Sequence, residues 1–247
     1  MAVTAGEAEA DTGGFTLGLE QADIADACQS AIDELKARES YSISVASSVV
    51  STSEYYGDAD YTNHFRRHGE NRLNEMYEAD GSLSAGGGDL VYDGQYAWYL
   101  GDQWCWQDGM SVPEGVNGWL DEYAPANKTI LFPEGTGVIS PDTVSYQAEW
   151  TQEQWGEEIQ YSGLFTFTFQ ADGTLSAATA DYVQPVSEED GGGEVRYIRT
   201  LTVMDEAPED TAAAIQAVAD TAMTPAEVEE YRILAQQVSE VPSNKTS

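Results

Sequence analysis

The chain has 247 residues, of which 41% are hydrophobic, so it can form a sizeable core and is not a disordered chain. Ten Lys and Arg oppose 44 Asp and Glu, and the formal charge of −34 is spread along the whole length. Because nucleic acids and anionic membrane surfaces are bound by basic patches, this charge excludes both as partners and indicates a solvated, self-repelling surface.

Residues 1–19 are small, acidic and Gly-rich, and we expect them to form a flexible linker. This composition is typical of a segment that follows a removed signal or anchor. Lys is scarce, whereas Ser, Thr, Tyr and Trp are abundant. Together these features predict an extracytoplasmic protein, at the cell surface or secreted, which is anchored through a missing N-terminus.

An amphipathic helix is predicted from Ala22 to Arg38, because its apolar residues recur at helical spacing. These residues are Ile24, Cys28, Ala31, Ile32 and Leu35. Alternation of apolar and polar residues then predicts antiparallel strands. They cover residues 41–51, 61–68, 72–79, 90–92, 96–100, 104–106, 144–150, 159–170, 175–183 and 195–204.

Turn residues divide this meander. Asp93-Gly94 predicts a tight type I′ hairpin turn, which needs positive φ angles. Residues 86–88, three consecutive glycines, predict a loop. Residues 108–142 are interrupted by Pro and Gly and predict an irregular insertion or lid, in which only residues 116–123 could be helical.

The end of the chain is predicted to be helical. Pro208 suits a first helical turn, and Thr224-Pro225-Ala226-Glu227 matches a capping box. Residues 241–247 are expected to be frayed. We therefore expect an α+β fold in residues 20–240, a single domain with an N-terminal helix, a long antiparallel β-meander and C-terminal helices.

This order of elements resembles the LolA/LppX-like lipoprotein-carrier superfamily. The resemblance rests on the helix Ala22–Arg38, the strand Tyr41–Ser51 and the hairpin-rich stretch Leu90–Trp106. It implies an open half-barrel whose helices cover the concave side, and it brings no catalytic residues. This chain is richer in Tyr and Trp than carriers with an aliphatic cavity.

The polar candidates for chemistry are weak. His64 and His68 share a strand face, but Arg66 lies between them and opposes a metal cation. We interpret this basic cluster as paired internally with acidic residues, and docking of an anionic group stays the alternative. Cys28 and Cys105 are interpreted as two separately buried thiols, and a disulfide between them stays the alternative. We expect no metal, no cofactor and no enzymatic activity.

The aromatic residues predict a ligand site, although strand aromatics are usually core. The candidate ligand-binding residues are Trp98, Trp104, Trp119, Trp150, Trp155, Tyr161, Phe165 and Phe167. The leading hypothesis is a monomeric, non-enzymatic binding or sensing domain that holds an apolar or amphipathic ligand, such as a lipid or peptide. The alternative is a protein-interaction ectodomain of an envelope signalling protein, and a glycan-acting enzyme ranks last.

Overall fold

The computed structural model describes residues 18–54, 56–108, 118–154, 157–188 and 191–230. The helices are η1 (Gln21–Asp23), α1 (Ile24–Ala37), α2 (Gly118–Tyr123) and α3 (Pro208–Thr221). The first six strands are β1 (Ser40–Ser51), β2 (Ala59–His68), β3 (Asn71–Glu78), β4 (Leu83–Tyr92), β5 (Gln95–Leu100) and β6 (Gln103–Trp106). The others are β7 (Thr129–Leu131), β8 (Gly137–Ser140), β9 (Thr143–Gln154), β10 (Glu157–Phe169), β11 (Leu175–Pro185) and β12 (Glu194–Val203).

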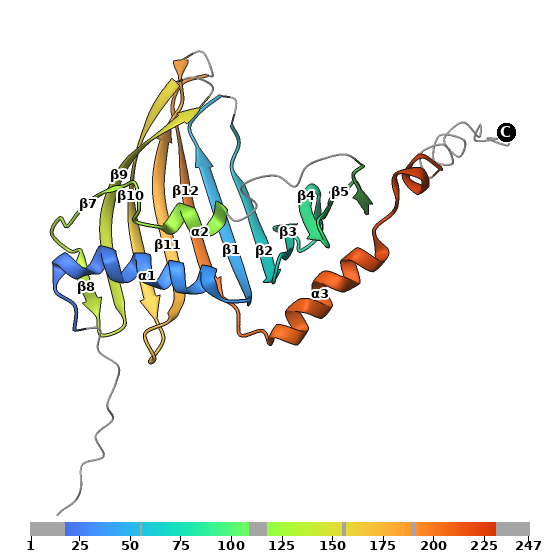
Figure 1. The fold of residues 1–247 in the computed structure, drawn as a ribbon. Coiled ribbons are helices and arrows are strands. Elements are labelled where there is room, and N and C mark those ends of the chain that lie inside the picture. The colour runs from blue at the N-terminus through green and yellow to red at the C-terminus, as the bar shows by residue number, and fades with distance from the viewer. Residues whose placement is uncertain (1–17, 55, 109–117, 155–156, 189–190, 231–247) are drawn as a thin grey trace, which may run out of the picture.

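All twelve strands form one antiparallel sheet, with the order β6-β5-β4-β3-β2-β1-β12-β11-β10-β9-β7 and with β8 also paired to β9 (Figure 1). The central pairing joins β1 to β12, so the two ends of the meander meet, with Val45 opposite Leu201. The terminal strands β6 and β7 are not paired with each other. The predicted open half-barrel architecture is therefore confirmed.

Local sequence explains most of the strands. In β10, Tyr161, Phe165 and Phe167 are buried and alternate with the exposed residues Ser162 and Leu164, as period two requires. The turn between β4 and β5 has positive φ at both central positions, 50° at Asp93 and 75° at Gly94, which confirms the predicted type I′ hairpin.

The larger core lies on the face of the sheet that α1 and α2 cover, which we call the inner face (Figure 1). The apolar residues predicted for the first helix are all buried there. They pack against strand residues of β1 and β9–β12, including Ile43, Phe165 and Phe167, each 0% exposed. The N-terminal helix thus shields the inner face, as the sequence predicted.

The helix α3 packs on the opposite, outer face, which corrects the expectation that all helices cover one apolar face. Its Ile215 joins a second core with Leu73, Leu90, Ala97 and Trp104. On β2, Phe65 belongs to the inner core and is opposite Asn74 of β3. The next residue of β2, Arg66, is opposite Leu73, which in turn is opposite Leu90 of β4. Since neighbouring residues of a strand point to opposite faces, the two cores lie on opposite sides of the sheet.

The three glycines expected to form a loop instead lie within β4, beside a register shift between β3 and β4. A Cβ atom on Gly88 would lie 2.5 Å from Cη2 of Trp104 and 2.9 Å from Cβ of Tyr99. The glycine is therefore needed for the close approach of these aromatic side chains, which local sequence does not reveal.

The segment expected to be an irregular insertion contains α2, β7 and β8 in its described part, and α2 agrees with the predicted helical turn.

Residues 225–230 are helical after the predicted capping box, in which the Thr224 backbone N–H and hydroxyl donate to Glu227 Oε2. Before it, Met223 exchanges backbone hydrogen bonds with Trp104 and Trp106, at 2.8 and 2.9 Å, and covers the edge of β6. The predicted linker, residues 1–19, lies outside the described residues except for residues 18 and 19, and the predicted frayed tail, residues 241–247, lies wholly outside them.

Cys28 and Cys105 are both buried and free, so the interpretation as two separate thiols is confirmed. Burial raises the pKa of each thiol, and the Asp102 carboxylate adds to this for Cys105. Within the described ranges, no helix has the length and apolar character needed to cross a membrane.

Candidate functional site

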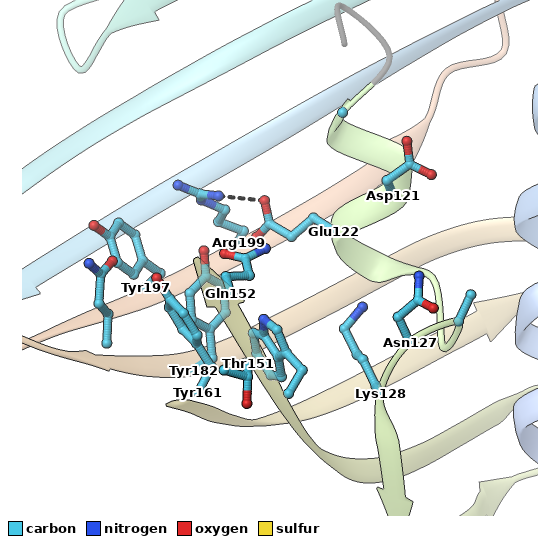
Figure 2. Close-up of a pocket in the computed structure, with 14 residues that line it drawn as sticks. Asp121, Glu122, Asn127, Lys128, Thr151, Gln152, Tyr161, Tyr182, Tyr197 and Arg199 are labelled. Carbon is cyan, nitrogen blue, oxygen red and sulfur yellow. Dashed lines mark hydrogen bonds and ion pairs between the residues drawn. The ribbon is translucent and has the colours of Figure 1, made fainter. Parts of the chain in front are cut away.

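A cavity of about 650 Å³ opens on the inner face, between the sheet and the segment that follows α2 (Figure 2). Its lining comes from α2, the following loop and the strands β9, β10, β11 and β12. The lining residues are Gly118, Asp121, Glu122, Ala126, Asn127, Lys128, Trp150, Thr151, Gln152, Tyr161, Tyr182, Gln184, Tyr197 and Arg199.

Four aromatic rings form a continuous row along the floor of this cavity. Trp150 stacks on Tyr161, with ring centroids 5.2 Å apart, and meets Tyr182 edge-on at 5.5 Å. Tyr182 in turn stacks on Tyr197 at 5.1 Å. The row follows from strand register, because Trp150 is opposite Tyr161 and Tyr182 is opposite Tyr197.

A glycine makes room for this row. Gly163 is opposite Tyr182, and a Cβ atom at Gly163 would lie 2.6 Å from the Cβ atom of Tyr182. Burial raises the pKa of Tyr161 and Tyr197, and burial together with the Glu122 carboxylate raises that of Tyr182. The three phenols are therefore protonated at neutral pH and can act as hydrogen-bond donors.

At one end of the row, Arg199 forms an ion pair with Glu122 of α2 (Figure 2). The guanidinium carbon lies 4.8 Å from the ring centroid of Tyr197 and 5.5 Å from that of Trp119. Burial is the largest single influence and lowers the pKa of Arg199, but the Glu122 carboxylate together with Tyr182 and Tyr61 holds this pKa above its usual value. This pair attaches α2 to the sheet.

At the other end, Lys128 places its ammonium over the rings of Trp150 and Phe165, 5.6 and 5.3 Å from their centroids. Its Nζ donates to the backbone carbonyl of Ala124. Burial lowers the pKa of Lys128 to about 8, although the carboxylates of Glu122 and Asp121 act in the opposite direction. Arg199 and Lys128 thus lie at opposite ends of the cavity (Figure 2).

The structure separates the aromatic residues that the sequence singled out. Trp150 and Tyr161 line the cavity, and Phe165 and Phe167 are fully buried in the core of the same sheet face. Trp119 lies on α2 and packs against this core. Trp104 belongs to the second core, Trp98 lies on the distant strand β5, and Trp155 lies outside the described residues.

Several lining residues were not predicted. Tyr182 and Tyr197 follow the alternation of their strands, so a count of aromatic residues on the inner face could have found them. Lys128 and Arg199 stand out only as two of ten basic residues in a strongly acidic chain. Glu122 carries no local signal, because its partner is 77 residues away.

The basic cluster on β2 is paired internally, as interpreted from the sequence. Arg66 donates to Glu75 at 2.9 Å and to Glu206 at 3.2 Å. The ring of His64 lies 5.1 Å from that of Tyr77, and burial together with the Arg66 charge lowers the pKa of His64. In the part of the chain that the structure describes, no three His, Cys, Asp or Glu side chains are grouped to hold a metal ion.

No family model matches the sequence, and no curated protein matches it. Among solved structures, a LolA superfamily protein from Nitrosomonas europaea matches with 12% identity and a TM-score of 0.30, over 75% of this chain and 96% of that one. A DUF1329 family protein from Desulfovibrio piger matches with 6% identity and a TM-score of 0.28, over 76% and 92%. MucB in complex with MucA(peri) matches with 12% identity and a TM-score of 0.12, over 77% and 97%.

Scores of this size support no inference about ligand or activity. The arrangement of elements described above is an open half-barrel, an antiparallel sheet left open between β6 and β7 with the helix α1 across its inner face.

Proposed function

We propose that this protein is an extracytoplasmic, non-enzymatic binding domain that holds a small amphipathic ligand in the cavity between α2 and the strands β9–β12. The observation that carries the proposal is the incomplete cover of the inner face. The helix α1 seals one part of the face, and beyond it a row of four aromatic rings lines an open cavity.

The size and lining of the cavity suit such a ligand. Small-molecule sites commonly have volumes of about 300–1,000 Å³ and combine apolar walls with a few polar groups. Here the half-buried ring of Trp150 offers apolar contact, and the small exposed parts of Tyr161 and Tyr182 extend it, although the exposed lining as a whole is more polar than apolar. Gln152, Asn127 and the tyrosine hydroxyls add hydrogen-bonding groups around them. A ligand with an apolar body and a polar part matches both kinds of surface.

The charged groups of the cavity argue for binding and against glycan hydrolysis. Glycoside hydrolysis uses two carboxylates held on opposite sides of the scissile bond. The two lining carboxylates, Asp121 and Glu122, are neighbours on α2, and they form ion pairs with Lys36 and Arg199. A binding role requires no free carboxylate.

A blocking substitution tests the proposal. Gln152 is exposed on β9, two residues from Trp150, and lines the cavity, so Gln152→Trp adds a large ring beside the aromatic row. Gln170 is exposed in the turn after β10, outside the cavity lining, so Gln170→Trp is the matched control. The neutral fluorescent amphiphile N-phenyl-1-naphthylamine serves as the probe.

We expect saturable binding of one probe molecule per wild-type chain and a loss of about tenfold or more in affinity for Gln152→Trp, since the new ring occupies volume that the probe needs. Gln170→Trp should bind as the wild type does. The proposal is wrong if the wild-type protein shows no saturable binding, or if both variants bind equally well. If the expected result is obtained, mass spectrometry of molecules extracted from the purified protein identifies natural ligands.

A second candidate, a protein-interaction ectodomain, is favoured by the outer face of the central strands. A shallow hollow of about 630 Å³ lies there, lined mainly by small or uncharged residues of β1, β2 and β12 that include Ala46, Thr62 and Ile198. Cross-linking of the protein in its native envelope would test this candidate. We expect cross-links from the outer face to one partner protein. The absence of any such cross-link would exclude this candidate.

A further inference from the structure

Among the described residues, Lys128 is the cation of the cavity that has no ion-pair partner. Of its four charged lining residues, Glu122 is paired with Arg199, and Asp121 is paired with Lys36 outside the cavity. Lys128 forms no ion pair with any carboxylate of the described residues, although the whole chain has a charge of −34. A half-buried ammonium without a counterion is unusual, because burying a charge is costly unless it is paired.

The hydrogen bonds of Lys128 are also incomplete. An ammonium group has three N–H donors, and within the described ranges the only acceptor for Lys128 Nζ is the carbonyl of Ala124. The rings of Trp150 and Phe165 stabilise the charge from one side. Asn127, the chain neighbour of Lys128, and Trp150, whose ring lies below the ammonium, also line the cavity, so a group bound beside them could reach it.

We propose that the ligand of this site is an amphipathic acid, whose carboxylate or phosphate group pairs with the Lys128 ammonium while its apolar body lies along the rings of Trp150, Tyr161 and Tyr182. This inference rests on the function proposed above and names the chemical class of its ligand. A charge-assisted hydrogen bond to an acid supplies the counterion and acceptors that Lys128 lacks in the protein itself. Arg199 already has an ion-pair partner in Glu122, so it does not need an acidic group from the ligand.

The charge state of Lys128 agrees with this role. With a pKa of about 8, the amine is mainly protonated at pH 7 and loses its charge in mildly alkaline solution. The titratable groups that act on it are Glu122 and Asp121 of α2, and both raise its pKa. The nearest sheet side chains, Trp150 and Phe165, do not titrate.

The test compares four ligands with the same ten-carbon chain, decanoate, decyl phosphate, decanol and decyltrimethylammonium, each as a competitor of the neutral fluorescent probe. The variants are Lys128→Met, which keeps the length of the side chain, Lys128→Arg, which keeps the charge, and Arg38→Gln. Arg38 is exposed just after α1 and outside the cavity lining, so its substitution changes the net charge by the same amount and serves as the control.

We expect Lys128→Met to weaken binding of decanoate or decyl phosphate by about tenfold, as one charge-assisted hydrogen bond of about 1.4 kcal/mol requires, and to leave decanol unchanged. The acid that loses affinity identifies the head group as carboxylate, phosphate or both. Lys128→Arg and Arg38→Gln should bind the acids as the wild type does. In the wild type the acid affinity should fall as pH rises through about 8, whereas in Lys128→Arg it should not.

Three results would overturn the inference. In the first, the acids lose no affinity in Lys128→Met; in the second, they lose it together with decanol; in the third, they bind no better than decyltrimethylammonium in the wild type. If decanol still binds in these cases, the binding function stands and only the acid class is wrong. If none of the four ligands displaces a probe that binds saturably, the acid class is wrong and the binding function stands, whereas a probe that does not bind saturably shows that the binding function itself is wrong.

Discussion

Arg199 of β12 and Glu122 of α2 form an ion pair above the aromatic row of the cavity, although 77 residues separate them in the chain. Their side chains are 15% and 18% exposed, so both charges have lost most of their water. The guanidinium also lies 5.9 Å from the ring centroid of Tyr182. The pair therefore connects the short helix α2, the sheet and the floor of the cavity.

Glu122→Gln should lower the free energy of unfolding by about 2 kcal/mol, because it leaves the Arg199 guanidinium largely buried without its carboxylate. The control is Asp181→Asn, which breaks the pair between Asp181 and Arg196, whose side chains are 28% and 52% exposed. We expect it to cost less than about 1 kcal/mol. Urea unfolding followed by circular dichroism measures both, and equal losses would contradict the assigned role.

Lys128→Met should change how stability depends on pH. Burial lowers the pKa of Lys128 in the folded state from 10.5 to about 8, so between these values the unfolded chain binds more protons than the folded one. The contribution of Lys128 is therefore unfavourable below pH 8 and is relieved as pH rises to about 10.5. Wild type should gain stability relative to Lys128→Met over this range.

Chemical unfolding of both proteins at pH 7, 9 and 10.5 measures this difference. Titration of the buried tyrosines contributes equally to both proteins and cancels. A difference that stays constant with pH would show that the ammonium of Lys128 is as well solvated in the folded protein as in the unfolded chain.

Gly88→Ala should destabilise the protein by about 2 kcal/mol, because the added methyl group would overlap the ring of Trp104 in the second core. Gly57→Ala is the control, since no atom lies within 4 Å of a Cβ atom built there. Thermal unfolding followed by tryptophan fluorescence reports on both. A Gly88→Ala protein as stable as the control would mean that the ring moves aside at no cost.

Met223→Pro should lower stability by about 1 kcal/mol relative to Met223→Ala, because proline cannot donate the backbone hydrogen bond that reaches the carbonyl of Trp104. The loss also exposes the edge of β6, so the proline variant should associate at high concentration. Light scattering of the two variants measures association, and identical behaviour would show that Met223 does not protect this edge.

Local patterns were enough to predict the helix α1 and ten of the twelve strands, because each depends on periodicity or on turn residues such as Asp93 and Gly94. The half-barrel was implied by the family resemblance, and β7 and β8 lie in the segment that was expected to be irregular. The predicted capping box at Thr224 holds for the same reason. These features are determined within about ten residues of chain, where a single sequence is most informative.

The features that the sequence did not reveal depend on pairing between distant segments. The face that α3 covers follows from the register of Leu73 with Leu90, and the position of Gly88 follows from its contact with Trp104. In the same way, Trp150 and Trp104 looked equivalent in the sequence, but strand order places one in the cavity and the other in the second core. Neither strand order nor register is a local property.

The placement of α1 and α3 on opposite faces gives the molecule two hydrophobic compartments, and both contain tryptophan. Trp119 and Trp150 pack against the compartment beside the cavity, whereas Trp104 and Trp106 belong to the one that α3 covers. Fluorescence from the second pair can therefore serve as an internal standard. A ligand that alters only the first pair has entered the cavity, and an agent that alters both has unfolded the sheet.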